Sequence, residues 1–201
     1  MSRFNLKKGD RFTIEKSESL SKIKVELSWD GDTDLDASTF LVGDDGSIHN
    51  DADFVYYNSE FRQEPFDRAK HGNKKRYLAE VRPMSADGSV LGSIDMREGG
   101  GNSEVINVDL DKVSPEIYEI IFVATVHSGE NFGNVGNPKI IVSNDETGKE
   151  LCDYALNQEF SSADAVEVAK LICDEDGEWK FEAVGMGYDG GLETLIGIYA
   201  E

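Results

Sequence analysis

The sequence predicts a mainly β protein, folded as a two-sheet β-sandwich with one or two short peripheral helices. Short β-branched or aromatic runs recur along the chain, Gly, Asp and Asn clusters separate them, and only two segments have helical spacing. With 201 residues, 39% of them hydrophobic, the chain has enough apolar material for one folded core. It contains four prolines and no Ser/Pro-rich linker, so we expect a single domain over residues 1–201.

The clearest strand is predicted for residues 22–29, where apolar side chains at every second position from Ile23 to Trp29 share one face. The other strands follow from β-branched or aromatic runs bounded by turn-forming residues. They are expected at residues 39–42, 54–57, 105–110, 119–126, 139–143 and 179–184. Seven or more short strands of this kind favour a sandwich.

Apolar residues at helical spacing predict two helices. In residues 164–172 the apolar face consists of Ala165, Val168, Ala169 and Ile172. The second helix is expected at the C-terminal stretch, residues 192–199. Both helices would cover an edge or an end of the sheets.

Residues 60–82 differ from their surroundings because they carry seven of the twenty positive charges. These are Arg62, Arg68, Lys70, Lys74, Lys75, Arg76 and Arg82. We expect an inserted basic loop here. It either offsets part of the chain's self-repulsion as a solvated excursion or forms a docking surface for an acidic partner or a second copy of the chain.

The charge balance excludes nucleic-acid binding through a basic face, because 40 acidic residues against 20 basic ones give a formal net charge of −20. Residues 1–13 contain no signal-peptide-like apolar run, and the longest β-rich apolar stretch, residues 120–126, is too short to span a membrane. We therefore expect a cytoplasmic protein without membrane insertion. In that reducing compartment Cys152 and Cys173 should be free, buried thiols.

Aspartates are concentrated in residues 30–53, and this cluster is the strongest functional feature of the sequence. Asp30, Asp32, Asp34 and Asp36 stand at alternate positions and would project to one side of an extended segment. A turn at residues 43–47 would fold a second group back beside the first, formed by Asp44, Asp45, Asp51 and Asp53. Such carboxylates must take up protons or recruit a cation, and hard oxygen ligands of this kind favour Ca²⁺ over Mg²⁺.

The linear EF-hand loop does not fit, because counting from Asp30 places Leu35 and Leu41 where that loop needs Gly and Glu. A calcium site would therefore be assembled from separate loops of the β-scaffold. The alternative is that the Asp-rich loops only keep turns soluble.

Catalytic chemistry has little support in the sequence. His49, His71 and His127 lie in different contexts, and no nucleophile–base arrangement can be placed from spacing. A pair of glycosidase-type carboxylates needs separations that a sequence does not give. We predict no catalytic residues.

Seven segments, in order along nearly the whole chain, resemble the tellurite-resistance TerD family. They are Phe-Asn-Leu-Lys-Lys-Gly at 4–9, Leu-Ser-Trp-Asp at 27–30, Asp-Leu-Asp-Ala-Ser at 34–38, Asp-Ala-Asp-Phe-Val-Tyr-Tyr-Asn at 51–58, Asn-Phe-Gly-Asn-Val at 131–135, Gly-Glu-Trp-Lys-Phe at 177–181 and Ala-Val-Gly-Met-Gly-Tyr at 183–188. The resemblance implies a calcium-binding β-sandwich of bacterial stress responses, including tellurite resistance, with no established catalytic reaction.

The resemblance also implies a set of calcium ligands. It places them at Asp34, Asp36, Asp51, Asp53 and Asn131, with Asp30, Asn58 and Asn134 as additions. The chain departs from the family pattern at residues 97–104, where ligand density is lower and Glu104 is the surviving candidate. The basic insertion is a second departure, and it leaves the choice of partner open.

Three functions remain in competition at this point. The first is a non-catalytic binding or scaffold module of a stress-response system, ordered by Ca²⁺ and acting with other Ter-type proteins. The second is a scaffold whose basic insertion recruits partners while the metal is incidental. The third is a hydrolase that uses Ca²⁺ as a Lewis acid.

Overall fold

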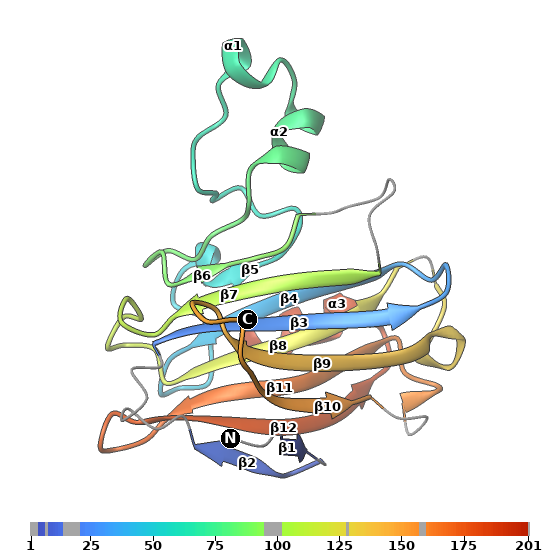
Figure 1. Ribbon diagram of the computed structural model, residues 1–201. Helices are drawn as coiled ribbons and strands as arrows, with labels where there is room; N and C mark the ends of the chain where they lie inside the picture. The colour runs from blue at the N-terminus through green and yellow to red at the C-terminus, as the bar shows by residue number, and fades with distance from the viewer. Residues whose placement is uncertain are drawn as a thin grey trace.

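The computed structural model describes residues 4–6, 8–13, 21–94, 102–127, 129–156 and 160–200. In these residues, twelve strands form two six-stranded sheets that pack as a sandwich (Figure 1). The first sheet has the order β1-β10-β9-β3-β7-β6, and the second has the order β2-β12-β11-β8-β4-β5. Neighbouring strands are antiparallel except β1 and β10, which are parallel. The predicted two-sheet sandwich is confirmed.

Each sheet collects strands from both halves of the chain. The first sheet consists of β1 (Phe4–Leu6), β3 (Lys22–Asp30), β6 (Val90–Leu91), β7 (Ser103–Asp109), β9 (Gly136–Asn144) and β10 (Glu150–Ala155). The second consists of β2 (Arg11–Thr13), β4 (Leu35–Val42), β5 (Phe54–Val55), β8 (Glu119–Val126), β11 (Ala165–Cys173) and β12 (Trp179–Tyr188). Between the sheets lies one apolar core, to which β3 contributes Ile23, Val25 and Leu27 as its alternation predicts.

All seven predicted strands form, and all except β8 differ from the prediction at one or both ends. β8 has the predicted bounds, β4 and β9 begin earlier, β12 ends later, and β5 is only two residues long. Sequence analysis missed β1, β2, β6, β10 and β11. The turn expected at residues 43–47 does form, because the backbone N–H of Gly43 donates to the carbonyl of Ser47 at 3.0 Å.

The predicted helix at residues 164–172 is wrong, because this segment forms the central strand β11 between β8 and β12. A β-bulge between Glu167 and Ala169 shifts the register against both neighbours. As a result Val168 and Ala169, although adjacent in sequence, both pack in the core between the sheets. The bulge therefore produces apolar spacing that imitates a helix.

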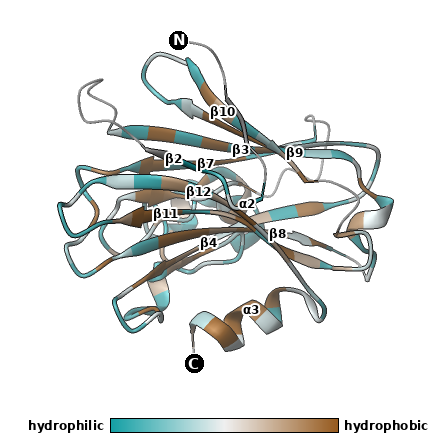
Figure 2. Cartoon of the chain, turned by 90° about the horizontal axis from the view of Figure 1, so that it is seen from below, coloured by the Kyte–Doolittle hydropathy of each residue, from teal (hydrophilic) through white to brown (hydrophobic). Residues whose placement is uncertain are grey.

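The predicted C-terminal helix is confirmed as α3 (Gly191–Tyr199), which lies on the outer side of the second sheet (Figure 2). Its buried Leu195 packs into a small second core with residues of β4, β5, β8 and β11. Polar contacts hold both ends: Asp164 accepts from the N–H groups of Gly190 and Gly191, and the Tyr199 hydroxyl donates to buried Glu167 at 2.8 Å. No helix in the described part of the chain is long and apolar enough to cross a membrane.

Residues 60–82 form an arm that connects the two edge strands β5 and β6 and projects away from the sheets (Figure 1). The arm is not a plain loop, because it contains α1 (Arg68–His71) and α2 (Lys74–Glu80), capped by Asp67 and Asn73. The buried guanidinium of Arg62 organises its base by donating to the carbonyls of Tyr57, Ser59, Leu78 and Val81.

Most positive charge in the arm is used within it. Arg62 and Arg82 donate to backbone carbonyls, and three further cations pair with arm carboxylates: Lys70 with Glu64, Lys74 with Glu60 and Arg76 with Glu80. Within the described residues only Arg68 and Lys75 of the arm have no ion pair or hydrogen bond from their charged groups. The arm therefore carries little free positive charge.

As predicted, Cys152 and Cys173 form no disulfide within the residues that the structure describes. Cys152 is buried, and burial raises the pKa of its thiol to about 12. Cys173 is half-buried.

Candidate functional site

The acidic residues of the predicted site divide between the two ends of the sandwich. We define the Asp30 end as residues 30–36, 102–104, 127 and 131–137, and the Asp53 end as residues 44–53, 85–89 and 114. Asp36 is the second residue of β4, whereas Asp53 precedes Phe54, which pairs with Phe40 near the other end of that strand. At about 3.3 Å per residue, these two positions lie roughly 17 Å apart along β4.

The expectation that four alternate aspartates line one side of an extended segment is wrong. β3 ends at Asp30 in the first sheet, and β4 begins at Leu35 in the second. Gly31 turns the chain between them with a φ of +97°, a conformation that glycine adopts more easily than other residues. The turn at residues 43–47 likewise leaves the second group of aspartates at the Asp53 end, away from the first group.

Hydrogen bonds hold three segments side by side at the Asp30 end. The Thr33 hydroxyl donates to the carbonyl of Asn134 at 3.2 Å, and the Asn137 amide donates to the Asp30 carboxylate at 2.7 Å. From the start of β7, the Asn102 amide donates to the carbonyl of Gly31 at 2.5 Å. The topology therefore brings Asp30, Asp34 and Asp36 near the turn of residues 131–134, as the predicted site requires.

The predicted ligands at the Asp30 end differ in their exposure to solvent and in their hydrogen bonding. Asp34 and Asn134 are exposed, whereas Asp36 is buried, with one carboxylate oxygen 3.7 Å from Nδ1 of His127. Asn131 precedes the short 3₁₀ helix η3 (Phe132–Asn134), and its side-chain oxygen accepts from the N–H of Gly133 at 3.1 Å. Asp30 is exposed but bonded to Asn137.

Glu104 joins the two sheets. Its side chain is buried, and Oε2 accepts a hydrogen bond from the backbone N–H of Ala37 at 2.6 Å. This N–H lies on the edge of β4 that faces away from β8, beyond the short pairing with β5. Glu104 therefore satisfies a backbone donor that the sheet leaves unpaired.

The Asp30 end has calcium-type donors, but they do not converge. Within the residues that the structure describes, no three Asp, Glu, His or Cys side chains lie close enough together to hold a metal ion. Carboxylates, amide oxygens and backbone carbonyls are nevertheless the ligands that calcium prefers. Most of the stretch at 97–104, where the sequence departs from the family pattern, lies outside the described residues.

The Asp53 end holds a pair of acids with opposite pKa shifts. Burial, and then the negative charge of Asp87, raise the pKa of Asp53. Burial alone would also raise the pKa of Asp87, but hydrogen bonds outweigh it and hold that pKa below its ordinary value. The donors to Asp87 are the Ser85 hydroxyl at 2.7 Å and the N–H groups of Ser89 and Ser114, each at 2.9 Å.

The remaining predicted ligands lie away from the Asp30 end. Asp51 is exposed in the 3₁₀ helix η2 (Asp51–Asp53) at the Asp53 end. Asn58 is exposed in the turn between Tyr56 and Ser59, at the base of the arm. The structure therefore separates Asp51, Asp53 and Asn58 from the other candidates.

The three histidines lie in three different environments. His49 is 3.3 Å from Asp45, and buried His71 is 3.3 Å from Glu64 inside the arm. His127 faces Asp36. Sequence analysis overlooked two residues that act directly on predicted ligands. Asn137 donates a hydrogen bond to Asp30, and the charge of Asp87 contributes to the raised pKa of Asp53. The Asp-Gly pair at residues 87–88 is a turn signal that could have drawn attention to Asp87.

Comparison with known proteins identifies the family. The TerD domain model matches residues 2–199. The chain is 34% identical to tellurium resistance protein TerD of Serratia marcescens, covering 97% of this chain and 96% of that protein. It is also 34% identical to general stress protein 16U of Bacillus subtilis, with the same coverage.

The fold is also found among solved structures. The crystal structure of a homologue of telluride resistance protein (TerD) from Streptomyces coelicolor A3(2) superposes with a TM-score of 0.63 at 21% identity. The match covers 89% of this chain and 96% of that one. This likeness concerns the fold. The family model and the sequence relatives show that the chain belongs to the TerD domain family of tellurium-resistance and stress-response proteins.

Proposed function

We propose that this protein is a calcium-binding, non-catalytic module of a bacterial stress response, and that the Asp30 end is where the ion binds. The observation that carries the proposal is the placement of three loops side by side there, with carboxylates on one and amide groups on another. The names of the relatives, which refer to tellurium resistance and general stress, support the cellular role.

The Asp30 end is a better candidate than the Asp53 end because hydrogen bonds from the protein already occupy the carboxylates of Asp53 and Asp87. Asp34 is exposed, and within the described residues its carboxylate has no hydrogen bond or ion pair. By contrast, Asp87 already accepts three hydrogen bonds, and the N–H of Ala86 donates to Asp53. A cation at the Asp53 end would have to replace these bonds.

The same geometry explains how an ion would act. Since no three acidic side chains converge in the described residues, the loops at the Asp30 end must move together to surround a cation. Asp30, Asp34, Asp36, Asn131 and Asn134 are the residues we propose to hold it, with Glu104 at the inner rim. Calcium would supply the positive charge that allows these carboxylates to approach one another.

Binding would therefore be coupled to loop order, and the ordered end would present a surface to other Ter-type proteins in the cytoplasm. The proposal assigns no reaction to the chain. The non-catalytic part of the proposal is supported by the positions of the three histidines, which lie apart from one another and beside different acidic residues.

Calorimetric titration of calcium, combined with thermal melts, tests the proposal. The matched variants are Asp34→Asn and Asp51→Asn, which remove one exposed carboxylate from the Asp30 end and the Asp53 end. We expect calcium to raise the melting temperature of the wild type and of Asp51→Asn, and to raise that of Asp34→Asn much less. Equal calcium responses in both variants, or an unchanged wild-type melt at millimolar calcium, would refute the assignment.

A further inference from the structure

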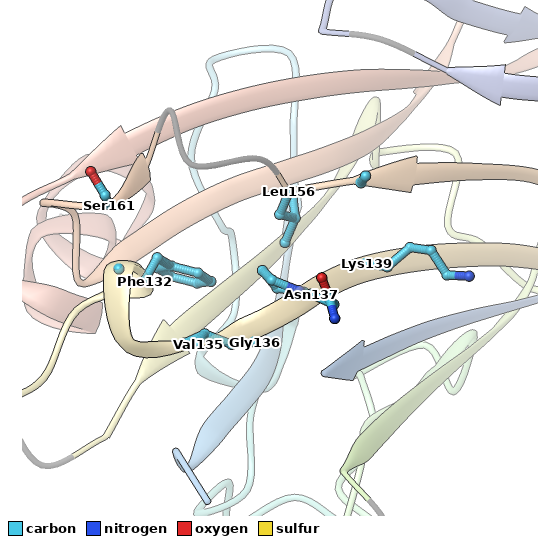
Figure 3. A pocket seen from close by; sticks show the side chains of 10 residues that line it. Phe132, Val135, Gly136, Asn137, Lys139, Leu156 and Ser161 are labelled. Carbon is cyan, nitrogen blue, oxygen red and sulfur yellow. The ribbon is translucent and has the colours of Figure 1, made fainter. Parts of the chain in front are cut away.

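A pocket of about 720 Å³ lies beside the Asp30 end, and its lining keeps charged and apolar groups apart (Figure 3). Phe132 and Leu156 belong to the core between the sheets. Lys139 precedes buried Ile140 on β9, and strand alternation directs the lysine away from that core. The lining residues therefore place no cation against the apolar side chains, and we assign this pocket no ligand.

An oxidisable side chain lies at the end of β12, outside the proposed calcium site. Residues 185–188, Gly-Met-Gly-Tyr, belong to a segment that resembles the TerD family, and the calcium proposal gives them no role. The side chain of Met186 is 48% exposed. Gly185, with a φ of +60°, lies where β11 and β12 shift register, and beyond this shift Met186 stands opposite Glu167. The bulge therefore sets the Met186 sulfur beside a buried carboxylate.

The sulfur of Met186 and the carboxylate of Glu167 compete for one hydroxyl group. The Tyr188 oxygen lies 3.0 Å from Sδ of Met186 and 3.2 Å from Oε2 of Glu167, yet this hydroxyl has a single hydrogen. Burial, and then the charge of Glu167, raise the pKa of Tyr188 to about 12, so the hydrogen is retained at neutral pH. Because a thioether is a weak acceptor, the hydrogen bond goes to the carboxylate.

Glu167 connects this pair to α3. Its side chain is buried, and in the described part of the chain its carboxylate accepts side-chain hydrogen bonds from the hydroxyls of Tyr188 and Tyr199. Tyr199 is the last residue of α3. If Tyr188 turns away, water is the replacement donor, and the Tyr199 end of α3 must lift to admit it. A buried carboxylate that loses one of two donors therefore weakens the attachment of the helix.

We propose that Met186 is an oxidation site, converted to the sulfoxide by hydrogen peroxide, and that the sulfoxide loosens α3 by drawing the Tyr188 hydroxyl away from Glu167. A sulfur lone pair attacks one peroxide oxygen, and the O–O bond breaks as the S–O bond forms. The departing hydroxide takes the remaining proton and leaves as water. The sulfur thus loses two electrons to the peroxide, and a weak acceptor is replaced by a polar oxygen.

Peroxide treatment of the full-length chain tests the proposal, with dithiothreitol added afterwards to reduce oxidised thiols. Peptide mass spectrometry should show Met186 oxidised about tenfold faster than half-buried Met84. Hydrogen exchange should then be about fivefold faster at residues 195–200, which form the second half of α3 and its C-cap. Methionine sulfoxide reductases should restore the slow exchange.

Two substitutions at position 186 separate the sulfoxide from other effects of peroxide. Met186→Leu and Met186→Gln have similar length at an exposed position, but only Gln carries a polar oxygen. Met186→Leu should keep slow exchange in α3 and remove the peroxide response, whereas Met186→Gln should speed the exchange without peroxide. Met84→Leu is the control that should keep the wild-type response. In Tyr188→Phe, oxidation of Met186 should have no further effect on α3.

Four results would overturn the proposal. The site is wrong if Met186 is oxidised no faster than Met84, or if Met186→Leu responds to peroxide as the wild type does. The coupling is wrong if the sulfoxide form exchanges like the untreated protein at residues 195–200. It is also wrong if peroxide speeds α3 exchange equally in Tyr188→Phe and the wild type, because the hydroxyl would then play no part.

Discussion

At the Asp53 end, three donors surround the carboxylate of Asp87, whereas at the Asp30 end the carboxylate of Asp34 is exposed and accepts no hydrogen bond from any residue described. Both ends arise from Asp-rich turns of one sequence. The two ends differ in whether protein donors already satisfy the carboxylates, and this difference is the reason why we propose the ion at the Asp30 end.

Among the substitutions that test this comparison, Asp87→Asn is expected to have the largest effect on stability. In Asp87→Asn, one side-chain oxygen becomes an NH₂ group facing a donor, so we expect a loss of about 3 kcal/mol in the free energy of unfolding. Urea denaturation at pH 7 measures it. Asp44→Asn, an exposed change of equal charge at the same end, should have little effect. Similar losses in both variants would mean that charge, rather than hydrogen bonding, sets the stability of this end.

Glu104 tests the Asp30 end in the same way. Glu104→Ala leaves the N–H of Ala37 without its acceptor, so we expect a loss of about 2 kcal/mol in unfolding free energy even in EDTA. Glu104→Gln keeps an acceptor oxygen and should recover most of this loss. If Glu104→Ala were destabilising only when calcium is present, the residue would be an ion ligand and not a bridge between the sheets.

The opposite pKa shifts of Asp53 and Asp87 predict that the two carboxyl groups change the free energy of unfolding with pH in opposite directions. The pKa of Asp53 is raised, so its ionised form costs stability at neutral pH, and this cost disappears as the pH falls through its folded pKa towards 3.8. Asp53→Asn should therefore stabilise the protein by up to about 1 kcal/mol at pH 7, and less at pH 4.

Asp87 should behave in the opposite way. Its folded pKa is lowered, so ionisation contributes stability above its ordinary pKa of 3.8, and this contribution is lost as the pH falls through the folded pKa. Chemical denaturation of Asp53→Asn and Asp87→Asn from pH 3 to pH 7 gives, for each substitution, the slope of its effect on the free energy of unfolding against pH. Slopes of the same sign would contradict the opposite roles of these two carboxyl groups.

The smallest effect is expected at Asp34. Without calcium, Asp34→Asn should leave the unfolding free energy within experimental error of the wild type, because the carboxylate is exposed and unbonded in the described structure. Denaturation in EDTA checks this. A clear destabilisation would show that the Asp30 end is a structural turn like the Asp53 end.

Sequence analysis predicted most of the sandwich because alternating strands such as β3 carry a period-two pattern that is independent of distant contacts. It failed at β11, where a bulge moves Val168 and Ala169 to one side and a helix covers the other face. Bulges depend on the neighbouring strands, so a local pattern does not reveal them.

The arrangement of the candidate residues could be predicted only in part. The family resemblance grouped Asp34, Asp36 and Asn131 around one ion, and the structure brings the loops at residues 30–36 and 131–134 side by side. The resemblance also grouped Asp51 and Asp53 with them, although an eight-residue strand separates the two sets. The direction of β4 between the two turns is a property of the sheet topology, which short-range spacing does not encode.

The central claim is that calcium binds at the Asp30 end and leaves the Asp53 end unchanged. A calcium titration of the ¹⁵N-labelled protein, followed residue by residue by NMR, tests it most directly. The claim predicts saturable shifts in the amides of residues 30–36, 102–104 and 131–137, with little change at residues 44–53 and 85–89. Shifts concentrated at residues 44–53 and 85–89, or no shifts at millimolar calcium, would contradict it.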